Sequence, residues 1–147
     1  MTRRVVNYSG CFICGEDNPA GLRLDFYFDP ETKKACTEFI ADRNYEGYRD
    51  ILHGGIITSV LDEVMIKAIL ASGFLAVTSR LNVEFKQPAE IGQKLRAEGW
   101  VTGQKGRVFF TEGCLLGDNK ETLATGKGVY ILAEGELAGK LKRSELK

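Results

Sequence analysis

The residues best suited to chemistry in this sequence are one aspartate, Asp62, and the run His53-Gly54-Gly55 that precedes it. From Gly54 to about Ser72 the apolar residues recur at i, i+3 and i+4 spacing, which predicts an amphipathic helix. Asp62 falls on a helix face that is turned away from the predicted sheet and carries no basic partner. The other residues of that face are Thr58, Met65, Ile66 and Ile69.

Removing the Asp62 carboxylate from water without a compensating partner is costly. Asp62 is therefore either exposed, or bonded to a backbone N–H of a neighbouring loop, or placed where its helix face meets another subunit. In the last case it can serve as a catalytic base.

The start of the helix could hold a developing negative charge. Gly54 and Gly55 leave the first backbone N–H donors uncovered by side chains, and such donors form an oxyanion hole when a carbonyl oxygen approaches. Asp62 lies eight residues beyond Gly54, roughly 12 Å along the helix axis. The two cannot act on one carbonyl within a single chain, so a shared site requires two chains.

His53 is the only histidine, and the sequence has neither a second metal-ligating histidine nor a nucleophilic serine elbow. We expect His53 to bond the backbone and fix the start of the helix. A further helix face carries Ser59, Glu63 and Lys67, with Glu63 and Lys67 at i, i+4 spacing. We expect this face to be exposed to solvent, with Glu63 as an ordinary surface carboxylate.

Four cysteines are present, two of them in Cys11-Phe12-Ile13-Cys14, with Cys36 and Cys114 alone. A structural zinc site usually needs a second close pair of ligands, which the sequence lacks. The pair is also not placed in the strand–helix–strand unit of thiol redox proteins. We therefore expect no metal and no cofactor, and two half-buried cysteines in an N-terminal turn.

The remaining pattern predicts strands at residues 22–28, 34–40, 77–85, 95–102, 108–116 and 122–132, separated by short turn sequences. Two strands, one helix and four strands favour an α+β fold in which one antiparallel sheet buries the helix. We expect a single domain over residues 1–147, with a turn-rich segment at 1–21 and a basic tail or short helix at 135–147. A helix this apolar suggests a second subunit.

Composition excludes some classes of protein. The 147 residues include 20 basic and 20 acidic side chains, so the net charge is zero and no duplex nucleic-acid partner is expected. No secretory signal or membrane-spanning stretch is present, so we expect a cytoplasmic protein with no membrane partner.

The run His53-Gly54-Gly55 followed by Asp62-Glu63 resembles the signature of hotdog-fold acyl-CoA thioesterases of the phenylacetate-degradation (PaaI) type. The resemblance extends over most of the chain. It includes Cys11 to Gly15, Asn18-Pro19, Gly21-Leu22, Leu81 to Phe85, Pro88-Ala89, Gln104 to Arg107 and Ala124 to Gly126.

The resemblance implies a homodimer with sheets joined edge to edge, often paired into a homotetramer. Asp62 would be general base or nucleophile, the Gly54 N–H of the other subunit would polarise the thioester carbonyl, and Thr78 would place the water. His53 and Gly55 would help to form the substrate site, and the acyl group would lie along the helix. The CoA phosphates would meet basic residues, for which the candidates are Lys86, Lys105 and Arg107.

Gly47 departs from the family pattern, because some relatives carry an asparagine or glutamine there that binds the thioester. Asn44 or the pair Tyr48-Arg49 could replace it. The function expected is hydrolysis of an acyl-CoA or aroyl-CoA to the free acid and CoA. The alternatives are a non-catalytic acyl-CoA-binding protein and, less favoured, a hotdog dehydratase, which would need a pocket histidine.

Overall fold

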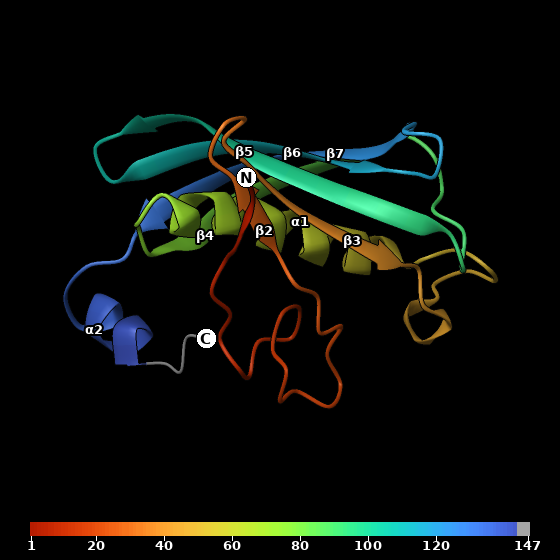
Figure 1. The fold of residues 1–147 in the computed structure, drawn as a ribbon, viewed down its shortest axis with the longest axis horizontal. Helices are drawn as coiled ribbons and strands as arrows, with labels where there is room; N and C mark the ends of the chain where they lie inside the picture. The colour runs from red at the N-terminus through yellow and green to blue at the C-terminus, as the bar shows by residue number, and fades with distance from the viewer. Residues whose placement is uncertain (144–147) are drawn as a thin grey trace.

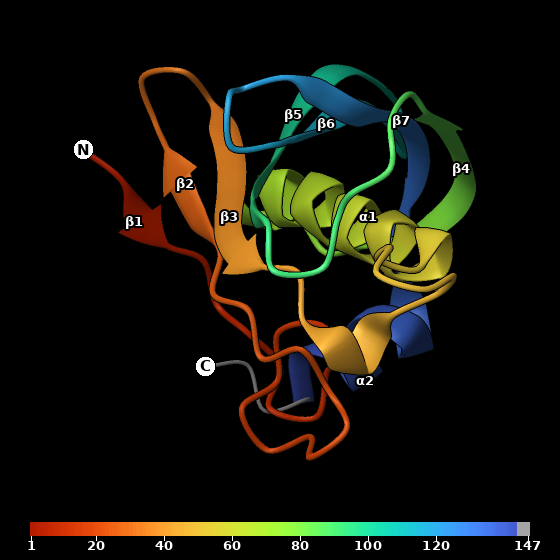
Figure 2. The same ribbon diagram turned by 90° about the vertical axis from the view of Figure 1, so that its right-hand side faces the viewer.

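A computed structural model describes residues 1–143. Within that range seven strands form one antiparallel sheet in the order β1-β2-β3-β5-β6-β7-β4. Their bounds are Arg3–Arg4 (β1), Tyr27–Asp29 (β2), Lys34–Ile40 (β3), Ala76–Phe85 (β4), Lys94–Lys105 (β5), Val108–Leu116 (β6) and Thr122–Leu132 (β7). The sheet curls around helix α1, Gly54–Ala71 (Figures 1 and 2). The α+β hotdog fold predicted from the sequence is confirmed.

The helix α1 forms where the apolar repeat predicts it. His53 is its N-cap residue, and Gly73, with φ of +96°, follows its last turn in the left-handed conformation that glycine adopts without strain. Its buried apolar side chains are Ile57, Val60, Leu61, Val64, Met65, Ala68 and Ile69. Burying this set against the sheet stabilises the fold.

A row of glycines lets the helix lie close to the sheet. Gly99, Gly113 and Gly126 are cross-strand neighbours on β5, β6 and β7. A Cβ atom on Gly99 would lie 2.8 Å from the carbonyl carbon of Val64, closer than real Cβ contacts allow. The Met65 side chain fills the space over Gly113 and Gly126. Met65 therefore packs against the sheet of its own chain. The prediction that Met65 lies on a helix face turned away from the sheet is wrong.

Most strand predictions hold, and the first one differs. Of the predicted strand at residues 22–28, only Tyr27 and Phe28 lie in the sheet, where they pair with β1. The backbone N–H groups of Leu22 and Leu24 instead bond the carbonyls of Phe12 and Ile13. The alternation of apolar residues correctly indicated an extended backbone here, but residues 22 to 24 bond the N-terminal loop and not a strand of the sheet.

Residues 5–24, here called the N-terminal segment, lie on the side of α1 away from the sheet (Figures 1 and 2). Lys67 Nζ bonds the carbonyl of Val6 and Asn7 Oδ1 in this segment, and Lys67 is only 2% exposed. The predicted solvent face of α1 is therefore wrong, because the segment covers it.

The expected tail begins as a helix, α2, at Gly135–Arg143, and residues 144–147 lie outside the described range. A 3-10 turn at Arg43–Tyr45 precedes α1. Among the described residues, no helix is both long and apolar enough to cross a membrane.

Candidate active site

Asp62 is held by two hydroxyl groups from the edge of the sheet. Thr78 Oγ1 donates a hydrogen bond of 2.9 Å to Asp62 Oδ1, and the Tyr130 hydroxyl donates one of 2.8 Å to the same oxygen. Thr78 lies on β4 and Tyr130 on β7. The prediction that Asp62 faces away from its sheet is wrong, because the curled sheet also reaches the flank of α1.

The two hydroxyls orient the carboxylate and leave its second oxygen, Oδ2, free of these bonds. Burial, reinforced by the negative charge of Asp62, raises the pKa of Tyr130 far above its usual range. Tyr130 therefore keeps its proton and acts as a donor at neutral pH. Asp62 itself is half-buried, so part of the residue is open to solvent.

The backbone of β4 and β7 sets the positions of these donors. Thr78 and Tyr130 are cross-strand partners, and the pairing shifts register between Thr78 and Arg80. Irregular pairing of this kind re-aims side chains and is common beside active sites. Sequence reasoning missed Tyr130. The available signal was its place in an alternating strand, since a buried tyrosine hydroxyl usually needs a hydrogen-bond partner.

At the start of α1, His53 does what the sequence predicts. Its Nδ1 accepts a hydrogen bond of 2.8 Å from the Gly55 N–H, which caps the helix. The Gly54 N–H makes no hydrogen bond to any described residue. Two glycines were proposed to hold an oxyanion. Of these, only Gly54 has a backbone N–H that is available to bond a substrate oxygen. Phe85 covers Gly54, since a Cβ there would lie 3.4 Å from the Phe85 ring.

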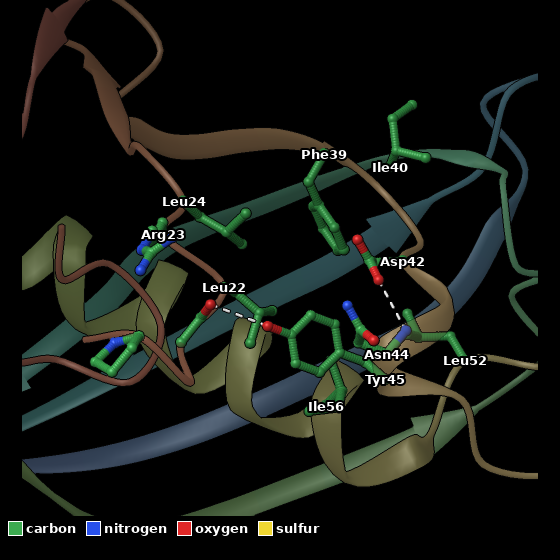
Figure 3. A pocket seen from close by; sticks show the side chains of 12 residues that line it. Leu22, Arg23, Leu24, Phe39, Ile40, Asp42, Asn44, Tyr45, Leu52 and Ile56 are labelled. Atoms are coloured by element: carbon green, nitrogen blue, oxygen red, sulfur yellow. Dashed lines mark hydrogen bonds between the residues drawn. The ribbon is translucent and has the colours of Figure 1, made fainter. Parts of the chain in front are cut away.

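Two adjoining cavities open beside the start of α1. The first, of about 380 Å³, is lined by Asn44, Tyr45, Glu46, His53, Gly55, Ile56 and Ser59. The second, of about 400 Å³, shares three of these residues and extends between the N-terminal segment and β3 (Figure 3). Leu22, Leu24 and Phe39 give the second cavity apolar walls. The Tyr45 hydroxyl bonds the Gly21 carbonyl at 2.9 Å and ties the two sides together (Figure 3).

Gly47 packs against His53, and a Cβ at Gly47 would lie 3.1 Å from the His53 Cα. A side chain at this position would therefore require the residue that caps the helix to shift by a few tenths of an ångström. Asn44, one of the replacements considered from the sequence, lines both cavities.

The three basic residues considered for phosphate binding are not brought together within one chain. Lys86 follows the end of β4 and pairs with Glu84 at 2.8 Å. Arg107 lies near the opposite end of β4, because its carbonyl bonds Leu132, the cross-strand partner of Ala76. Arg107 also pairs with Glu134, and Lys105 is the last residue of β5.

A second group of reactive side chains lies on the opposite flank of α1. The ligand-type atoms of Cys11, Cys14 and Glu63 all lie within 4.8 Å of one another. Burial raises the pKa of Glu63 to about 7, and a hydrogen bond from the Cys14 thiol lowers the pKa of Cys11 to about 5. Lys67 Nζ lies 3.6 Å from Glu63 Oε2. Glu63 is thus no ordinary surface carboxylate, as its 17% side-chain exposure also indicates.

The fold and the half-buried aspartate together define a hotdog protein with a helix-borne carboxylate. Residues 50–124, about half of the chain, match the thioesterase superfamily model, and the chain belongs to that family. The matched range includes Gly54, Asp62 and Thr78, but neither the cysteine pair nor Tyr130.

Solved structures share the fold. One thioesterase superfamily protein is 18% identical, with a TM-score of 0.79 over 84% of this chain and 60% of that one. The Escherichia coli PaaI protein is 21% identical, with a TM-score of 0.66 over 70% and 75% of the two chains. A Streptococcus mutans protein bound to acetyl CoA is 16% identical, with a TM-score of 0.66 over 69% and 82%.

Among curated proteins, an uncharacterised Schizosaccharomyces pombe protein is 27% identical over 93 residues. That match spans 62% of this chain and 53% of the yeast protein, so the chain covers about half the length of this relative.

Proposed function

We propose that this chain hydrolyses an acyl-CoA or aroyl-CoA thioester to the free acid and CoA. The observation that carries the proposal is the Asp62 carboxylate, which Thr78 and Tyr130 hold through one oxygen, while the other accepts no hydrogen bond from a described residue. Membership of the thioesterase superfamily supports the reaction class. The acetyl CoA bound to the Streptococcus mutans protein of the same fold supports the ligand class.

The site is proposed to form between two subunits. Strand β4 is the last strand of the sheet, and its outer edge has no neighbouring strand in the described chain. Such an edge is a template for pairing with a second copy. Antiparallel pairing about a twofold axis between Leu81 and Asn82 would set Thr78 opposite the partner subunit's Phe85. Asp62, whose carboxylate accepts the Thr78 hydrogen bond, would then lie near the partner subunit's Gly54, because the partner's Phe85 covers that glycine.

In this dimer the free oxygen of Asp62 takes a proton from water as the water attacks the thioester carbonyl. The carbonyl oxygen gains negative charge beside the partner subunit's Gly54 N–H, at the positive end of a helix. The carbon–sulfur bond then breaks, and the CoA sulfur leaves and takes up a proton. Direct attack by Asp62, with a transient anhydride, gives the same products.

The same twofold axis would unite the basic residues that one chain keeps apart. Lys86 directly follows Phe85, so the partner's Lys86 would approach the end of β4 near Arg107. Lys105 and Arg107 of one subunit and Lys86 of the other would form the phosphate-binding surface. The apolar cavity walls at Leu22, Leu24 and Phe39 would receive the acyl part.

A thiol-release assay over a panel of acyl-CoAs and aroyl-CoAs tests the reaction. We expect Asp62→Asn to lower kcat by about 10²- to 10⁴-fold, because a general base contributes about that much. Asparagine can still accept hydrogen bonds from Thr78 and Tyr130. Glu31→Gln, in the exposed turn after β2, is the control and should keep the wild-type rate.

Gly54 allows an unusually clean test of the oxyanion donor. Proline is favoured at the first position of a helix and replaces the N–H with a ring carbon, and the extended backbone of His53 is compatible with a following proline. We expect Gly54→Pro to lower kcat by about 10²- to 10³-fold. Gly54→Ala, which keeps the N–H, should retain most activity.

Two results would contradict the proposal. If the wild-type protein binds acyl-CoA in calorimetry but releases no thiol from any substrate, it is the non-catalytic binding protein instead. If Asp62→Asn keeps the wild-type rate, the assignment of Asp62 is wrong.

A further inference from the structure

The turn that contains Cys11 and Cys14 is built around a sulfur atom. Cys11 Sγ accepts backbone N–H groups from both Ile13 and Cys14, each at 3.3 Å. The Gly15 N–H bonds the Cys11 carbonyl at 2.9 Å and closes the turn. A Cβ on Gly15 would lie 2.4 Å from the Ser9 carbonyl oxygen, so the turn requires glycine there. Two N–H donors aimed at one sulfur stabilise it as a thiolate, the form that binds metals.

The helix brings a third ligand to this turn. Glu63 Oε1 lies 3.8 Å from Cys11 Sγ, and the three ligand-type atoms lie within 4.8 Å of one another. Around a tetrahedral zinc ion, two thiolate sulfurs are about 3.8 Å apart, and a sulfur and a carboxylate oxygen about 3.5 Å apart. The spacing of the cluster is therefore close to that of three corners of such a site.

The surrounding charge also fits a divalent cation. Two thiolates and the Glu63 carboxylate would carry three negative charges in a mostly buried place, which is costly unless they are neutralised. Lys67 is buried beside Glu63 and fixed by Val6 and Asn7. One divalent ion together with the Lys67 ammonium would balance the three anions.

We propose that Cys11, Cys14 and Glu63 bind one divalent cation of the zinc class and so fasten the N-terminal segment to α1. Thiolate ligands select zinc over magnesium or calcium, which prefer oxygen ligands. Three protein ligands leave the fourth tetrahedral position to water. The site is separate from the Asp62 site and makes the N-terminal segment a metal-stapled cover for the helix. This proposal replaces the sequence-based expectation of no metal.

The test uses the full chain, reduced and stripped of metal by a chelator. It is titrated with zinc against a chromogenic competitor and, separately, with cobalt. We expect about one zinc per chain and a thiolate-to-cobalt charge-transfer band in the near ultraviolet. Cys14→Ser and Glu63→Gln should each weaken zinc binding by more than about 100-fold, a larger loss than removal of an outer-shell partner causes.

Cys36→Ser and Cys114→Ser are the matched controls, since both cysteines are half-buried and neither belongs to the Cys11, Cys14 and Glu63 cluster. Both should bind zinc as the wild type does. Far-ultraviolet circular dichroism establishes that each variant is folded before titration.

The proposal fails if the folded wild type binds zinc no more tightly than Cys14→Ser, or if the cobalt complex lacks the thiolate band. It also fails if the reduced wild type binds no zinc and two thiols are lost on mild oxidation in the wild type but not in Cys14→Ser. That last result would assign the pair to a disulfide instead.

Discussion

Asp62 and Glu63 are neighbouring carboxylates on one helix, and their surroundings differ completely. Asp62 meets two hydroxyl donors at the β7–β4 edge of the sheet, and both bond the same oxygen. Glu63 lies under the N-terminal segment, beside two cysteine sulfurs and the Lys67 ammonium. One position suits reaction with a small molecule, and the other suits a fixed structural ligand.

The difference arises from helix geometry, because successive residues point about 100° apart on a helix of 3.6 residues per turn. That rotation is enough to move a side chain from the flank covered by the sheet to the flank covered by the N-terminal segment. The type of residue is nearly the same, so the neighbours from other parts of the chain decide what each carboxylate can do.

The largest expected effect comes from mixing subunits. Asp62→Asn and Gly54→Pro chains should each be inactive as homodimers, but a mixed dimer would contain one site with both groups intact. We expect random mixing after joint refolding to restore about a quarter of wild-type activity, a gain of about 25-fold or more over either parent. Thiol release measures it.

A matched mixture of Asp62→Asn with Asp62→Asn plus Gly54→Pro should stay inactive. No recovery in the test mixture despite exchange of subunits would show that both groups act within one chain. Recovery in the control, which contains no Asp62, would show that the reaction does not need Asp62.

The next effect concerns Glu63 in chelator-treated protein. Burial raises the pKa of Glu63 to about 7 from the ordinary 4.5. At pH values between these two, Glu63 is therefore protonated in the folded chain and ionised in the unfolded chain. The stabilisation is complete below about pH 4.5 and is lost as the pH rises through about 7, amounting to about 3 kcal/mol. Urea unfolding should show that Glu63→Gln gains stability relative to wild type over this range.

The same series on Glu31→Gln, in the exposed turn after β2, gives the reference for a surface carboxylate. If the wild-type and Glu63→Gln profiles run parallel from about pH 5 to about pH 8, Glu63 is not buried as described.

The smallest expected effect separates the two donors on Asp62. Tyr130→Phe keeps the buried ring but removes one hydrogen bond to a charged oxygen, so we expect kcat to fall about tenfold with little change in KM. Steady-state kinetics measure it, with the exposed Tyr27→Phe as control. A rate for Tyr130→Phe equal to that of Tyr27→Phe would leave Thr78 as the donor that orients Asp62.

Local patterns predicted much of the fold. The apolar repeat after Gly54 identified α1, and the alternation at residues 108–116 and 122–132 matched β6 and β7. These predictions succeed because the periods of helices and strands are visible in neighbouring residues. The helix-wheel assignments of Asp62 and Lys67 failed, because a wheel assumes one buried stripe, whereas the curled sheet and the N-terminal segment cover α1 on most sides.

The sequence by itself determined the helix, its glycine start capped by His53, and Asp62 as the carboxylate suited to chemistry. Each of these depends on residues a few positions apart. Tertiary structure alone decided that Tyr130 bonds Asp62 and that Glu63 joins Cys11 and Cys14. Those contacts join residues 68 and 52 positions apart, and only the packing of the sheet on one flank of α1 and the N-terminal segment on the other could bring them together.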